Sequence, residues 1–172
     1  MVKKLNMKPT ASVMYASLVI ASINGYGAEI PSGTPEAQTI SHEGYIPPLG
    51  EIMGLSQMRH SKLWFAGNAK NWSLAKYELG EIKEGFEDLG KYHPVFDELP
   101  IGSMAGVILD QPINDIHNAI ESKNRKKFRV SFNSLTNACN ACHQAARRGF
   151  IKILRPRTSP YSNQKFAIEA GQ

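Results

Sequence analysis

One segment of the 172-residue chain repeats its apolar residues at the period of an α-helix: NWSLAKYELGEIKEGFEDLGKYHP, residues 71–94. Its apolar positions recur at spacings of three and four, as one face of a helix requires; they are Trp72, Ala75, Leu79, Ile82, Phe86 and Leu89. Lys76 and Glu84 occupy the opposite face, and Pro94 ends the element. The segment predicts an amphipathic helix, which needs other apolar faces to pack against.

Two further segments show the same period. Residues 49–67 place apolar and small residues on one face and end near Gly67. Residues 128–146 carry a second long stripe, and Gly149 stands after it as a suitable C-cap. Each segment predicts another amphipathic helix of the same kind.

The segment PINDIHNAI predicts a shorter helix that starts at Pro112, because proline is favoured in the first turn. A long connection, residues 91–111, is then expected before it. Four helices with almost no alternating β-branched residues indicate an all-α fold, an antiparallel four-helix bundle over residues 49–149. Residues 29–48 and 150–172 are predicted to be an irregular N-terminal arm and a C-terminal tail.

The only two cysteines, Cys139 and Cys142, lie in NACNACHQAARRG, and His143 follows them at once. A disulfide this close along a helix has poor geometry. A redox pair belongs at the start of a helix after a strand, and zinc typically needs two pairs of ligands. The pattern C-x-x-C-H favours the fourth interpretation, covalent attachment of one haem c.

This interpretation gives each residue a role. The thiols of Cys139 and Cys142 would bind the haem vinyl groups as thioethers, and the imidazole of His143 would be the proximal ligand of the iron. The last helix would then carry the haem near its C-terminal end.

Residues 1–28 have the layout of a secretory signal peptide, with lysines, an apolar run and then small residues near Ala28. The run is short for a membrane span, so we expect cleavage beside Ala28 and a periplasmic protein with no membrane span. Three lysines leave with this segment, which brings the 20 Lys/Arg close to the 15 Asp/Glu. The charge therefore gives no reason to expect nucleic-acid binding.

A bundle whose last helix carries C-x-x-C-H resembles the class II c-type cytochromes, the cytochrome c prime family. The resemblance is carried by an amide, two phenylalanines and a cysteine in the family's order, namely Asn124, Phe128, Phe132 and Cys139. The family also favours a base four residues after the haem histidine, and Arg147 stands there. The resemblance implies that Arg147 contributes to haem binding, and it leaves a homodimer open.

The sixth iron position has three candidate states. Met53 lies on the apolar face of the first helix, at a depth that matches His143 if that helix runs antiparallel to the last one. A helix 1 methionine is the distal ligand that the low-spin members of the family use. His60 lies about 10 Å deeper, which suits a structural histidine better than a ligand. The third state is a vacant position.

These features predict a protein that carries single electrons between redox partners and is not an enzyme. The alternative is a five-coordinate haem protein that binds a small gas such as nitric oxide. A more remote third is a haem enzyme with His60 as its acid/base group. Basic residues after the haem motif, between Arg147 and Arg157, would pair with haem propionates or form a docking surface for an acidic redox partner.

Overall fold

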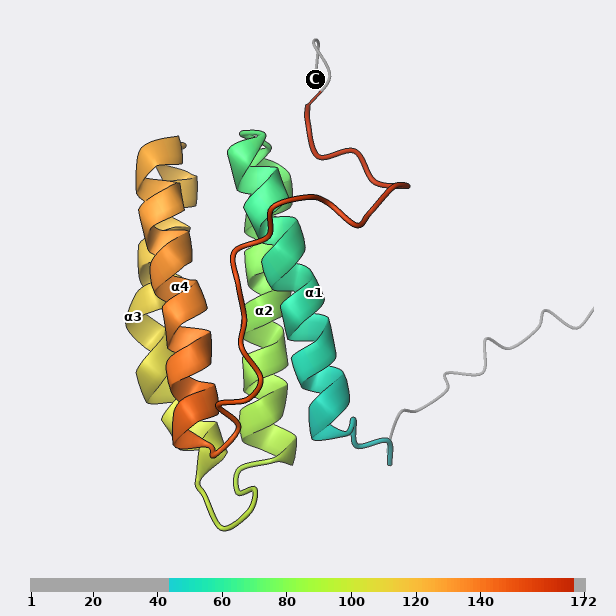
Figure 1. Ribbon diagram of the computed structural model, residues 1–172, viewed down its shortest axis with the longest axis vertical. Helices are drawn as coiled ribbons and strands as arrows, with labels where there is room; N and C mark the ends of the chain where they lie inside the picture. The colour runs from blue at the N-terminus through green and yellow to red at the C-terminus, as the bar shows by residue number, and fades with distance from the viewer. Residues whose placement is uncertain (1–43, 169–172) are drawn as a thin grey trace, which may run out of the picture. The chain divides into compact units, whose positions relative to one another are not determined.

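A computed structural model describes residues 44–168 and contains four α-helices there, with no β-strand within that range. They are α1 (Leu49–Asn68), α2 (Trp72–Tyr92), α3 (Ile101–Glu121) and α4 (Arg125–Ala145). Short connections join them, and successive helices pack side by side (Figure 1). The prediction of an all-α, antiparallel four-helix bundle is confirmed. The predicted signal peptide and most of the predicted arm lie outside the described residues.

Two asparagines start helices as the sequence pattern requires. The side chain of Asn71 accepts a hydrogen bond from the Leu74 N–H at 3.2 Å, and that of Asn124 accepts one from the Lys127 N–H at 3.0 Å. Each bond satisfies a donor that the first turn of a helix leaves without a partner. None of the helices within residues 44–168 is long and apolar enough to cross a membrane.

The third helix is longer than predicted. α3 begins at Ile101, so Pro112 lies inside the helix and does not start it. Proline removes one backbone hydrogen bond and costs about 3 kcal/mol in a helix interior. However, Ile101 and Leu109 are buried on the same face as Ile116 beyond the proline, and each such side chain contributes about 2 kcal/mol on burial. Burial of these side chains therefore offsets the cost of Pro112, and the helix continues on both sides of it.

The last helix also ends differently from the prediction. α4 ends at Ala145, and Arg147, in place of Gly149, takes the left-handed conformation with φ 58°. The N–H of Arg148 donates to the His143 carbonyl at 2.7 Å, and that of Arg147 donates to the Gln144 carbonyl at 3.1 Å. These two bonds form a Schellman cap without glycine.

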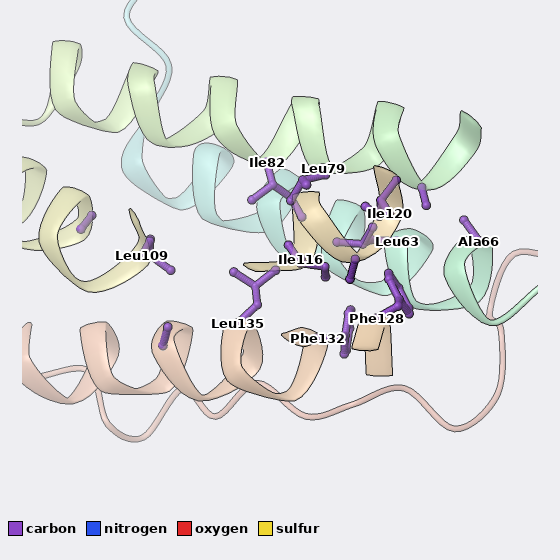
Figure 2. Packing of buried hydrophobic residues seen from close by; sticks show 14 of the residues in the cluster. Leu63, Ala66, Leu79, Ile82, Leu109, Ile116, Ile120, Phe128, Phe132 and Leu135 are labelled. Carbon is purple, nitrogen blue, oxygen red and sulfur yellow. The ribbon is translucent and has the colours of Figure 1, made fainter. Parts of the chain in front are cut away.

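Large side chains are fully buried toward the end of the bundle remote from the cysteines. Figure 2 shows Phe128 and Phe132 of α4 among the side chains of Leu63 and Ala66 from α1. A Cβ on Gly67 would lie 2.1 Å from the Phe128 ring, so glycine lets the ring rest on the α1 backbone. Of the neighbouring helix pairs, α1 and α4 nevertheless touch each other least. They diverge toward the cysteine end (Figure 1).

The C-terminal tail returns along the side of the bundle formed by α4 and α1 (Figure 1). Its Ile153 pairs with Asn140 of α4, and the Tyr161 hydroxyl donates to the Met58 carbonyl of α1 at 3.3 Å. The ring of Phe166 packs on Phe65 with 5.4 Å between centroids. The tail is thus fastened to both helices along its length.

Candidate functional site

An apolar cavity lies where α1 and α4 diverge. It holds about 550 Å³ of empty space, including the space open to solvent at its mouth, and it is called the inner cavity below. Residues of all four helices and the tail line it: Met53, Ser56, Gln57, His60, Ile82, Phe86, Leu89, Leu109, Leu135, Cys139, Cys142, His143 and Ile153.

A second, wider space, the outer cavity, adjoins it nearer the end of the bundle. Both share part of their lining, which includes Met53 of α1, Cys142 and His143 of α4, and Ile153 of the tail. The outer cavity adds Phe96, Ile101 and Arg148, among others, and holds about 1320 Å³ including open solvent. A site thus extends from the bundle interior to the surface beside His143.

The two thiols are free and partly buried. Burial among apolar groups raises the pKa of Cys139 to about 12 and also raises the pKa of Cys142. Reactive redox cysteines have lowered pKa values, so these surroundings do not suit a redox pair. Among residues 44–168, no three His, Cys, Asp or Glu side chains gather as a metal-ion site, and the zinc interpretation gains no ligands from the fold.

His143 is held in one tautomer. Its Nδ1 lies 2.9 Å from the Ile151 carbonyl oxygen, and a carbonyl can only accept, so Nδ1 carries the proton and donates. The lone pair of the neutral ring is therefore on Nε2. Metal-binding histidines commonly use one ring nitrogen in this way and leave the other for the metal. The half-exposed ring lines both cavities.

Across the cavities, α1 contributes Met53, which is partly buried and lines both of them. The structure therefore brings Met53 and His143 to the same site, as the antiparallel arrangement predicts. No protein group within the described residues bonds the Ser56 hydroxyl, which is buried one turn further along α1.

His60 also lines the inner cavity, but its polar edge is engaged. It is 4 % exposed, and its Nε2 lies 2.8 Å from the Thr136 hydroxyl oxygen. That hydroxyl donates to the Phe132 carbonyl at 2.9 Å, so His60 Nε2 must be the donor of the first bond. Burial lowers the pKa of His60 to about 4. The predicted burial of His60 is confirmed.

The two arginines after the motif take different places. Arg147 is exposed and does not line either cavity, because it occupies the left-handed position of the helix cap. Arg148 lines the outer cavity, pairs with Asp97 and lies over the Phe96 ring, 5.3 Å from its centroid. The family resemblance favoured Arg147, whereas the cap geometry turns its neighbour toward the site.

The residues present fit a covalently bound haem. Two neutral thiols and an imidazole with a bare Nε2 line one apolar cavity, and a thioether lines it from the facing helix. A porphyrin supplies four nitrogens of its own, so its iron needs one or two protein ligands and no cluster of three. Buried apolar walls also suit the large hydrophobic face of such a group.

Comparisons of the chain with models of protein families, with curated proteins and with solved structures give no match.

Proposed function

We propose that this chain is a periplasmic monohaem c-type cytochrome, of the class II kind, that carries single electrons between partner proteins. The observation that carries the proposal is the convergence of Cys139, Cys142 and the oriented His143 on an apolar cavity that Met53 lines from the facing helix. Haem iron, when bound there, supplies a reversible one-electron couple.

Each residue has a defined task in this proposal. The thiols of Cys139 and Cys142 would add across the two vinyl groups; each addition would break one S–H bond and one C=C π bond and form one S–C and one C–H bond, with no net change of oxidation state. His143 would hold the iron through Nε2, and Met53 would hold it through its thioether. The apolar residues around them would limit the contact of the group with water and so favour a high reduction potential.

The surface beside the site suits docking of an acidic partner. Phe150 and Leu154 are 80 % and 69 % exposed, and they belong to the same short segment as exposed Arg147, Lys152 and Arg157. Apolar side chains surrounded by positive charge favour brief encounters with a negatively charged redox protein, because the charge speeds association. This segment, residues 147–157, is called the docking segment below.

A second candidate function is the capture of a small gas at a vacant sixth position. The buried, unpartnered hydroxyl of Ser56 favours it, because a bound diatomic ligand would give that hydroxyl an acceptor. In this case Met53 only fills space in the cavity wall, as methionine commonly does.

The optical spectrum of the haem-loaded protein, with and without carbon monoxide, separates these candidates. Electron transfer predicts a low-spin spectrum that carbon monoxide does not change, and Met53→Ala should convert it to a high-spin form that binds the gas. Met58→Ala is the control, since Met58 does not line either cavity. A high-spin spectrum in the unmodified protein would exclude Met53 ligation and favour gas binding.

A further inference from the structure

The tail carries a hydrogen-bonding arrangement that acts on His143 and that the C-x-x-C-H pattern does not include. Asn140 lies between the two cysteines, three residues before His143, so both side chains leave the same face of α4. The tail passes over this face and bonds to both of them. The backbone of Ile151 is hydrogen-bonded to His143, and the backbone of Ile153 is hydrogen-bonded to Asn140.

The carboxamide of Asn140 pairs with the backbone of Ile153 as a neighbouring peptide group would. Its Oδ1 accepts from the Ile153 N–H at 2.8 Å, and its Nδ2 donates to the Ile153 carbonyl at 2.9 Å. Nδ2 also donates to the Thr136 carbonyl at 3.1 Å. These three bonds fix the orientation of the amide, because the flipped form would face carbonyl oxygens with its own oxygen.

The consequence for His143 follows from chain connectivity. Ile151 and Ile153 are two residues apart, so fixing the backbone at Ile153 limits where the Ile151 carbonyl can lie. The Ile153 side chain is 9 % exposed and lines both cavities. Its burial is a second contact that holds the tail at Ile153. The Ile151 N–H donates to the Arg148 carbonyl at 2.8 Å, which also holds this residue near the end of α4. The Ile151 carbonyl itself bonds α4 only through the His143 ring.

We propose that Asn140 is a positioning residue: it pins the tail at Ile153 and thereby holds the Ile151 carbonyl against Nδ1 of His143. The effect on haem rests on the proposed function, whereas the effect on the tail and the imidazole does not. In the haem-loaded protein the bond from Nδ1 makes the imidazole a stronger donor to the iron. Its loss should raise the reduction potential, since a weaker donor stabilises the oxidised iron less.

Asn140→Ala in the full chain tests this, with exposed Asn137→Ala on the same helix as the matched control. In the haem-free chain, amide exchange at Ile153 should become about tenfold faster or more, as expected from the loss of two or more hydrogen bonds. Nitrogen NMR should show His143 losing its preference for the Nδ1–H form. In the haem-loaded protein the midpoint potential should rise, and Asn137→Ala should change none of the three.

The outcomes separate the two proposals. Unchanged exchange at Ile153 and an unchanged His143 tautomer would overturn the positioning role, whether or not haem binds. An unchanged potential in a haem-loaded Asn140→Ala protein would overturn its effect on the iron. If Asn140→Ala loses its helical circular dichroism, Ile153→Pro removes the same hydrogen bond from the tail side, and the His143 tautomer again decides. A tail that responds as described in a chain that never binds haem would sink the proposed function alone.

Discussion

At the scale of single residues, the site depends on which ring nitrogen of each histidine donates a hydrogen bond and which one keeps a free lone pair. His143 has its Nδ1 proton engaged by Ile151, whereas His60 has its Nε2 proton engaged by Thr136. The two imidazoles near one cavity are therefore not equivalent. The free nitrogen of His143 is Nε2, the ring nitrogen remote from its own backbone. In His60 the corresponding nitrogen donates to Thr136 and so links α1 to α4.

The buried His60 makes the free energy of unfolding depend on pH. Its pKa is about 4 in the folded chain and about 6.5 in an unfolded one, so only the unfolded state binds the proton between these values. The contribution of His60 to the free energy of unfolding is constant above pH 6.5. It falls as the pH drops toward 4, by about 3 kcal/mol in all. Urea unfolding at several pH values should show that His60→Gln lacks this part of the loss, while His117→Gln at an exposed site retains it. Parallel pH profiles for the original chain and His60→Gln would contradict the assignment.

Gly67 is required by the contact between α1 and α4. Gly67→Ala would place a methyl group inside the Phe128 ring, and the shift it forces should lower stability by about 1–3 kcal/mol. Thermal unfolding measures the change. At Gly80 of α2 a Cβ meets nothing within 4 Å, so Gly80→Ala should stabilise the chain by up to about 1 kcal/mol. Equal effects of the two substitutions would rule out the clash.

At the scale of elements, polar pairs between helices add to the apolar core in fixing the register of the helices. Glu78 of α2 is 1 % exposed and accepts from Arg59 of α1 at 3.2 Å, and Arg59 also pairs with Glu81 at 2.7 Å. Burial raises the pKa of Glu78, and the hydrogen bond from Arg59 opposes that rise. Arg59 therefore offsets part of the penalty of burying this carboxylate.

Removing Arg59 should therefore be far more damaging than removing an exposed partner of similar charge. Arg59→Ala leaves Glu78 buried and unpaired, and we expect a loss of about 3 kcal/mol in unfolding free energy. Lys76→Ala breaks the exposed pair with Glu121, 2.8 Å long, and should change stability little. Denaturant titrations of both variants compare them directly. A similar small loss for Arg59→Ala would mean that water reaches Glu78.

The elements also show what the sequence could and could not predict. The spacing of apolar residues was sufficient to predict three helices and the position of Met53 opposite the cysteines. A helical period determines which face of each helix is buried. It missed the start of α3, since local proline rules gave no weight to the burial of Ile101 and Leu109. The Schellman cap at Arg147 was missed for a similar reason, because a cap is recognised from a glycine that this helix does not use.

The contacts of Asn140 with the tail have no periodic signal. They join residues 13 positions apart through backbone atoms of Ile153, which no side-chain pattern records. One hint was available: asparagine is a poor helix former, so its presence between the two cysteines of a long helix calls for a hydrogen-bonding role.

At the scale of the whole molecule, charge divides the surface in a way that suits the proposed function. The docking segment lies beside the cavities, whereas Arg125, Lys126, Lys127 and Arg129 lie at the other end of α4. The helix between them has 21 residues, or about 30 Å at 1.5 Å per residue. Screening over such a distance makes the two groups electrostatically independent.

This separation supplies an internal control for docking. Lys152→Glu should slow electron transfer to an acidic partner several-fold at low ionic strength, and added salt should shrink the difference. Lys126→Glu makes the same change of charge at the remote end and should have little effect. Stopped-flow rates with an acidic redox protein measure both. Equal slowing by the two substitutions would show that net charge, and not the docking segment, guides the encounter.

Covalent haem attachment tests the central claim most directly. The chain should be expressed with the machinery that matures c-type cytochromes, and its mass and haem stain recorded after denaturation. We predict one haem that survives unfolding, and its complete loss as a covalent adduct in Cys139→Ala/Cys142→Ala. A mature chain that carries no covalent haem, or a double variant that keeps it, would contradict the account.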